Sequence, residues 1–184
     1  MSQTHADCYS RTSILDGLIV AAEYENQGVK NLIWQMKYNY VKEISSVLSV
    51  ILSDYFFSND LVEYFTDFIV SPVPLHKVRL RARGFNQSAL IALEFAARAG
   101  LKHSPLLYRT RNSKTQVELE KKERFENVKD LFAPLADENS TDIKKVILVD
   151  DVATTGATIN ECAKTLKKAG ISEVWGLVVA RNSS

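Results

Sequence analysis

Short apolar runs alternate along the chain with longer segments whose apolar residues recur at helical spacing. The runs predict strands at residues 18–22, 67–71, 106–108, 146–149 and 174–180. Uninterrupted apolar runs are typical of strands buried on both faces, and strands that alternate with helices predict a mainly parallel sheet flanked by helices. The 184 residues are enough for one α/β domain with a substantial core.

The segments between these strands predict helices at residues 29–40, 41–57, 86–98 and 159–169. In the second helix we expect one apolar face to be buried, formed by Ile44, Val47, Leu48, Ile51 and Tyr55. The opposite side should then face solvent, and it carries Lys42, Glu43, Ser45, Ser46, Ser49 and Ser53. The third helix is nearly all apolar, which predicts that it is deeply buried.

The most informative motif follows the strand at 146–149. Two carboxylates, Asp150 and Asp151, end this strand, and a loop of small residues leads into the last helix: Ala153, Thr154, Thr155, Gly156, Ala157 and Thr158. Backbone N–H groups, hydroxyls and the positive end of a helix dipole together make a cradle for phosphate. The carboxylates can accept hydrogen bonds from vicinal sugar hydroxyls or hold Mg²⁺ through water. Alternatively, they only cap the helix.

This motif resembles the 5-phosphoribosyl-1-pyrophosphate (PRPP) signature of type I phosphoribosyltransferases. The resemblance implies that Asp150 and Asp151 face the ribose hydroxyls and that residues 153–158 surround the 5′-phosphate. In purine-salvage members, an acidic residue two positions before the loop glycine can act as a base. Thr154 stands at that position here, and a neutral hydroxyl cannot accept the proton near neutral pH. We therefore expect no transfer to a 6-oxopurine by that scheme.

A basic segment follows the strand at 67–71. It contains Pro74, Leu75, His76, Lys77, Arg79, Arg81 and Arg83. Ligands of open α/β sheets bind outside the carboxyl ends of the strands, so we expect this segment to lie beside the phosphate cradle and to hold a pyrophosphate. Two alternatives remain for this segment: it binds a nucleic-acid backbone, or it is a loop exposed to solvent without a ligand.

Further motifs resemble the competence protein F (ComF) family over residues 14–182. The matching stretches are Pro72-Val73-Pro74, Arg83-Gly84-Phe85-Asn86-Gln87-Ser88, Tyr24 with Met36-Lys37-Tyr38, residues 109–116, Arg124 with Asn127-Val128, and the Asp150-Asp151 motif. The family is associated with natural transformation and DNA uptake. The resemblance implies a phosphoribosyltransferase-like protein that binds PRPP and Mg²⁺ and transfers phosphoribosyl to an unidentified acceptor. The alternative is a non-catalytic module that binds nucleotides or single-stranded DNA, or that contacts a protein of the competence machinery.

The resemblance also divides the domain into functional segments. Residues 14–57 are expected to form a hood over the site, with Lys37 as a surface lysine packed along its stem. Residues 111–130 match the position of the superfamily's flexible catalytic loop. Arg124 in this loop is a candidate catalytic residue together with Asp150 and Asp151. The alternative for this segment is a solvated helix face. Residues 1–13 are expected to be a flexible tail.

Composition adds little to this picture. The formal net charge of +1 means that any binding of nucleic acid must come from a local patch. The family's paired Cys-x-x-Cys zinc motifs are absent, and only Cys8 with His5 lies at a metal-like spacing. With no leader and no apolar run long enough for a bilayer, we expect a cytoplasmic protein without membrane insertion.

Overall fold

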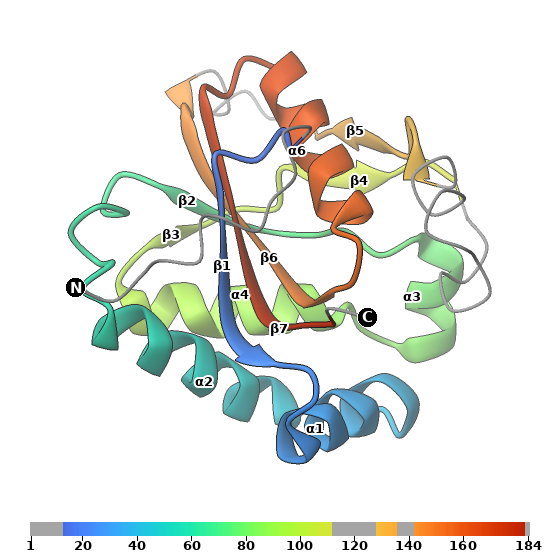
Figure 1. Ribbon diagram of the computed structural model, residues 1–184. Helices are drawn as coiled ribbons and strands as arrows, with labels where there is room; N and C mark the ends of the chain where they lie inside the picture. The colour runs from blue at the N-terminus through green and yellow to red at the C-terminus, as the bar shows by residue number, and fades with distance from the viewer. Residues whose placement is uncertain (1–12, 112–127, 136–141, 183–184) are drawn as a thin grey trace.

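The computed structural model describes residues 13–111, 128–135 and 142–182. Its centre is a five-stranded sheet in the order β1-β7-β6-β2-β3, in which every neighbouring pair is parallel (Figure 1). The strands are β1 (Gly17–Glu23), β2 (Ile69–Pro72), β3 (Lys102–His103), β6 (Lys145–Ala153) and β7 (Glu173–Arg181). A separate antiparallel pair consists of β4 (Leu107–Arg109) and β5 (Phe132–Pro134). The prediction of a mainly parallel sheet is confirmed.

Helices cover both faces of this sheet. On one face lie α1 (Gln27–Tyr38), α2 (Ile44–Ser58) and α4 (Gln87–Ala99), and on the other lies α6 (Ala157–Lys168) (Figure 1). Successive side chains of a strand point to opposite faces. Ile147 and Val149 of β6 therefore join the core under α1, α2 and α4, whereas Val146 and Leu148 pack with α6. One strand thus holds two cores together.

The buried face of α2 is rotated from the predicted one: Leu48 is buried and Ile44, Ile51 and Tyr55 pack against the core as expected, but Val47 does not. Val47 is 46% exposed, whereas Ser45, Ser49 and Ser53 are buried with Leu48, Leu52 and Phe56. The small serines let α2 pack closely on α4, and Ser45 Oγ donates a hydrogen bond of 2.6 Å to Glu94 Oε1. The hydroxyls of Ser49 and Ser53 donate to helix carbonyls at 2.8 Å. Because each buried hydroxyl has a partner, a polar helix face can be buried without a large penalty.

Four further elements differ from the expected pattern. The strand β6 continues through both carboxylates to Ala153, because β7 extends beside it and pairs Asp150 with Val178. The basic segment, for which no helix was predicted, forms α3 (Lys77–Arg83). The short strands β3 and β5 were not predicted either. By contrast, α4 begins after Asn86 and ends at Gly100 as expected.

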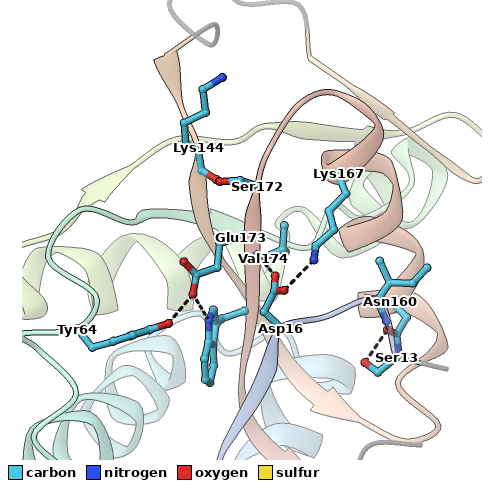
Figure 2. A network of polar contacts seen from close by, with 11 residues as sticks. Ser13, Asp16, Tyr64, Lys144, Asn160, Lys167, Ser172, Glu173 and Val174 are labelled. Atoms are coloured by element: carbon cyan, nitrogen blue, oxygen red, sulfur yellow. Dashed lines mark hydrogen bonds and ion pairs between the residues drawn. The ribbon is translucent and has the colours of Figure 1, made fainter. Parts of the chain in front are cut away.

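A polar network fixes the amino ends of the strands (Figure 2). Asp16, just before β1, accepts hydrogen bonds from Val174 N at 2.7 Å and from Lys167 Nζ at 2.8 Å. Glu173 accepts from Tyr64 Oη at 2.6 Å and from Trp175 Nε1 at 2.9 Å. These polar groups therefore serve the fold, at the end of the sheet opposite to the carboxylates of β6.

Within the described ranges, no helix has both the length and the apolar character that a membrane crossing requires.

The unexpected orientation of α2 leads to a paired prediction. We expect Ser49→Leu to lower the free energy of unfolding by about 1–3 kcal/mol, because a larger side chain must enter a tightly packed helix contact. Val47→Ser should change it by less than about 0.5 kcal/mol, because Val47 is half exposed. Urea unfolding of both variants is the measurement. The opposite order of effects would contradict this orientation of α2.

Candidate functional site

A cleft of ≈ 600 Å³ lies where β2, β6 and β7 end. Its walls come from segments far apart in sequence: the last turns of α1, the loop after β2, α3, the start of α4, β4 and the loop after β6. The polar and charged side chains that line it are Lys37, Arg79, Arg83, Asn86, Gln87, Ser88, Arg109, Asp150, Asp151, Thr154, Thr158 and Asn182. The cleft therefore brings together the carboxylate motif and part of the basic segment.

The loop after β6 has the backbone that a phosphate cradle needs. Gly156 is the N-cap residue of α6 with a φ of 73°, a left-handed conformation that a residue with a Cβ adopts only at a cost. Thr155 Oγ1 accepts a hydrogen bond from Ala157 N at 3.3 Å, while Thr154 and Thr158 line the cleft. The N–H groups in the first turn of a helix lack carbonyl partners within the helix, so the positive end of α6 borders the cleft. Ala153, Gly156 and Ala157 line a smaller adjoining cavity.

Asp150 lies beside the N-terminus of α4. Its Oδ1 accepts hydrogen bonds from Ser88 Oγ at 2.7 Å and from Asp151 N at 2.9 Å. Burial, followed by the charge of Asp151, raises the pKa of Asp150 to about 7, and these hydrogen bonds and the charge of Lys37 oppose the rise only in part. A carboxylate with this environment would be stabilised by a cation or by further hydrogen-bond donors.

Asp151 has a cationic partner that the sequence analysis placed elsewhere. Lys37 Nζ, in the last turn of α1, lies 2.8 Å from Asp151 Oδ1. Burial alone would lower the pKa of Lys37, but the charge and the hydrogen bond of Asp151 outweigh burial and raise it. The expectation of a surface lysine is wrong for this residue. The only signal in the sequence was the Met36-Lys37-Tyr38 stretch of the ComF resemblance, because helical spacing alone does not show what lies opposite α1.

The helical turn of α3 places the four basic residues of the predicted pyrophosphate segment on two different sides of the helix. Arg79 and Arg83, four residues apart on one side of the helix, line the cleft. Lys77 and Arg81 are exposed and do not line it. Pro74 and Leu75 line the cleft from the preceding loop. A helical conformation, rather than the extended one that alternate basic positions suggest, therefore decides which charges reach the site.

His76 holds α3 in place. Its side chain is buried, and its Nδ1 accepts a hydrogen bond from Val78 N at 3.2 Å as the N-cap of α3. Burial, then the positive charges of Arg109, Lys77 and Arg79, lowers the pKa of His76. A neutral imidazole with its proton on Nε2 is the form that can accept this bond. His76 thus positions the helix that carries Arg79 and Arg83.

Arg109 is a further cation that sequence reasoning did not assign to the site. It ends β4, lines the cleft, and lies with its guanidinium 5.7 Å from the centre of the Phe132 ring. Burial, then the charge of Arg79, lowers the pKa of Arg109 to about 10, so it remains charged at neutral pH. Among the described residues lining the cleft, four are basic and two are acidic, which favours an anionic ligand.

Two aromatic side chains stand at the hood side of this cleft. Trp34 and Tyr38, one turn apart on α1, are 50% and 53% exposed, and their ring centres are 5.7 Å apart. Of the residues predicted as a hood, β1 belongs to the main sheet, while α1 supplies the cleft wall. A flat ring could stack on this exposed pair.

Two adjacent carboxylates form the acidic part of the site. Within the described ranges, no group of three or more His, Cys, Asp or Glu side chains could hold a metal ion. Mg²⁺ usually keeps several waters and takes one or two carboxylates plus phosphate oxygens of a substrate. Asp150 and Asp151 fit that manner of binding. Arg124, His5, Cys8 and most of the predicted catalytic loop lie outside the described residues.

Comparisons with known proteins identify the family of this chain. A family model described as "Phosphoribosyl transferase domain" matches residues 91–184. Competence protein ComFC of Bacillus subtilis is 32% identical over 176 residues, which cover 90% of this chain and 68% of that protein. The chain belongs to the ComF family. DNA utilization protein YhgH of Escherichia coli K12, another relative, is 32% identical over 175 residues, covering 92% of this chain and 75% of that protein.

Other matches are more limited. Competence protein F of Haemophilus influenzae is 37% identical over 114 residues, which cover 60% of this chain and half of that protein. A hypoxanthine-guanine phosphoribosyl transferase from L. donovani has a TM-score of 0.40 at 12% identity, covering 74% of this chain and 71% of its own. The family assignment rests on the sequence relatives and the family model.

The raised pKa of Asp150 makes the stability of this ComF-family protein depend on pH. Between the ordinary carboxyl pKa of 3.8 and the raised value of about 7, the folded state holds a proton that the unfolded chain has released. Stability therefore falls as pH rises through this range. Asp150→Asn keeps an acceptor for Ser88 but cannot ionise, so its Tm advantage over the wild type should grow from about pH 4 to about pH 8. Thermal unfolding across this range is the check, and a constant difference would contradict the raised pKa.

Proposed function

We propose that this protein binds PRPP, or a closely related ribose-phosphate compound, together with Mg²⁺ in the cleft, and that it supports DNA uptake. The observation that carries the proposal is that one cleft joins a phosphate loop, a carboxylate pair and three arginines. PRPP needs these three kinds of partner, because it has a phosphate at one end, a pyrophosphate at the other, and vicinal hydroxyls between them.

The charges of the cleft suit such a ligand. The loop at residues 154–158 would take the 5′-phosphate, and Asp150 and Asp151 would accept hydrogen bonds from the ribose hydroxyls. Arg79, Arg83 and Arg109 would contact the pyrophosphate, for which planar guanidinium groups have the right geometry. Mg²⁺, held through water by the carboxylates, would offset part of the pyrophosphate charge.

For transfer of phosphoribosyl, the acceptor would have to enter beside α1. Thr154 lines the cleft but offers only a neutral hydroxyl, so an acceptor that needs no base at this position fits best. The names of the relatives, competence proteins and DNA utilization proteins, support a role in handling DNA.

The two faces of α3 provide a test with matched controls. Arg79→Gln and Arg83→Gln should each weaken PRPP–Mg²⁺ binding by about 10- to 100-fold, because a charge-assisted hydrogen bond contributes about 1.5–3 kcal/mol. Lys77→Gln and Arg81→Gln remove the same charge from the exposed side of the helix and should change the affinity less than about threefold. Isothermal titration calorimetry of all four variants is the measurement.

Two outcomes would count against this proposal. If the wild-type protein shows no heat of binding with PRPP and Mg²⁺, the cleft does not take this ligand. If all four substitutions weaken binding equally, the contribution comes from overall charge and not from Arg79 and Arg83.

A second candidate function is binding of single-stranded DNA without catalysis. The observation that favours it is the exposed Trp34–Tyr38 pair beside basic side chains, since single-stranded nucleic acids bind where bases can stack on aromatic rings next to positive charge. Trp34→Ala should then weaken binding of an oligothymidine by about 1–3 kcal/mol in a fluorescence-anisotropy titration. Trp34 is half exposed, so the fold should tolerate this change. Unchanged oligothymidine affinity would remove the aromatic pair from a DNA-binding role.

A further inference from the structure

The ion pair between Lys37 and Asp151 links α1 to the motif strand β6. Its atoms are 2.8 Å apart, and the two side chains are 25% and 9% exposed. The two partners are 114 positions apart in the sequence, and only the fold brings them together. A pair of this kind is more protected from solvent than an exposed surface pair, and it is therefore less weakened by salt.

The two carboxylates of the motif are compensated unequally. The ammonium of Lys37 contacts Asp151, whereas the hydrogen-bond donors to Asp150 are a hydroxyl and a backbone N–H, both neutral. The ammonium therefore occupies, on Asp151, the place that a hydrated cation would otherwise take. It is held there by the packing of α1, whose buried residues Val29, Ile33 and Met36 anchor the helix in the core.

We propose that Lys37 is a built-in counter-cation of Asp151, with which a divalent cation must compete for the carboxylate. This inference rests on the proposed function, in which Asp150 and Asp151 hold Mg²⁺. It assigns to α1 a role in setting how tightly the free protein binds the metal. After displacement, the ammonium remains on α1, in the wall of the same cleft as Arg79 and Arg83.

The test uses Mn²⁺ as a probe and the full chain without PRPP. Electron paramagnetic resonance would measure free Mn²⁺ in titrations of the wild type, Lys37→Met and Lys30→Met. Lys30 lies on the same helix, is exposed, and has its ammonium 5.8 Å from the centre of the Tyr24 ring, so its replacement makes the same charge change away from Asp151. We expect Lys37→Met to bind Mn²⁺ about tenfold more tightly than the wild type and Lys30→Met to change the affinity less than about threefold. Lys37→Met combined with Asp151→Asn should lose the gain.

Three results would overturn the proposal: equal Mn²⁺ affinity of the wild type and Lys37→Met, an equal gain in Lys30→Met, or no Mn²⁺ binding by Lys37→Met. The third counts because the carboxylates must accept a cation once the ammonium is removed. Circular dichroism of each variant checks that it is folded.

A measurement on the unaltered protein covers the case in which Lys37→Met fails to fold. The ion pair holds the Lys37 ammonium against Asp151, where its side chain is only 25% exposed, and so shields it from acetic anhydride. Acetylation of Lys37, resolved by peptide mass spectrometry, should rise when Mn²⁺ is added, while acetylation of Lys30 stays constant. Acetylation of Lys37 that Mn²⁺ does not change would also overturn the proposal.

These results can be separated from the proposed function. Competition between Mn²⁺ and Lys37 in a protein that ignores PRPP would overturn only the PRPP assignment. PRPP binding in a protein whose Mn²⁺ affinity is insensitive to Lys37 would overturn only the role of the lysine.

Discussion

Pairing of β6 between β2 and β7 is the constraint on which the rest of the structure depends. The strand is buried on both faces at Val146, Ile147, Leu148 and Val149, so both cores form only when β6 lies in the middle of the sheet. Its parallel neighbours all end at the same edge. The carboxylates and the phosphate loop that follow β6 are therefore delivered to the edge where the loop after β2 and the end of β7 also lie.

At this edge, two adjacent carboxylates are partly compensated by the cations around them. Burial of Asp150, followed by repulsion from the adjacent Asp151, raises the pKa of Asp150. Lys37 compensates Asp151, while Arg79, Arg83 and Arg109 give the rest of the cleft an excess of positive charge. Like charges placed side by side in a cleft lower stability when no ligand is bound, so their presence is typical of a binding site.

Two helices show how the orientation of an element changes its interpretation. In α2, the serine side was expected in solvent, yet it packs on α4 because small hydroxyl side chains allow a close helix contact and find partners such as Glu94. In α3, the helical turn separates Arg79 and Arg83 from Lys77 and Arg81, although alternate positions in the sequence look equivalent. In both cases local hydrophobicity was a poor guide, since the contact surface is polar or faces a ligand cleft.

The sequence by itself determined the main strands β1, β2, β4, β6 and β7 and the helices α1, α2, α4 and α6, but not β3, β5 or α3. It also determined the caps of α4 at Asn86 and Gly100 and the strand–carboxylate–loop–helix motif after residue 145. These features are local: apolar runs, capping residues and glycine positions act within a few residues, so their physics can be read along the chain. Only the tertiary structure decided that Lys37 meets Asp151, that Ser88 meets Asp150, and that Arg109 faces the cleft. These contacts join residues 62 to 114 positions apart. They depend on how helices are rotated and packed on the sheet, which no local pattern specifies.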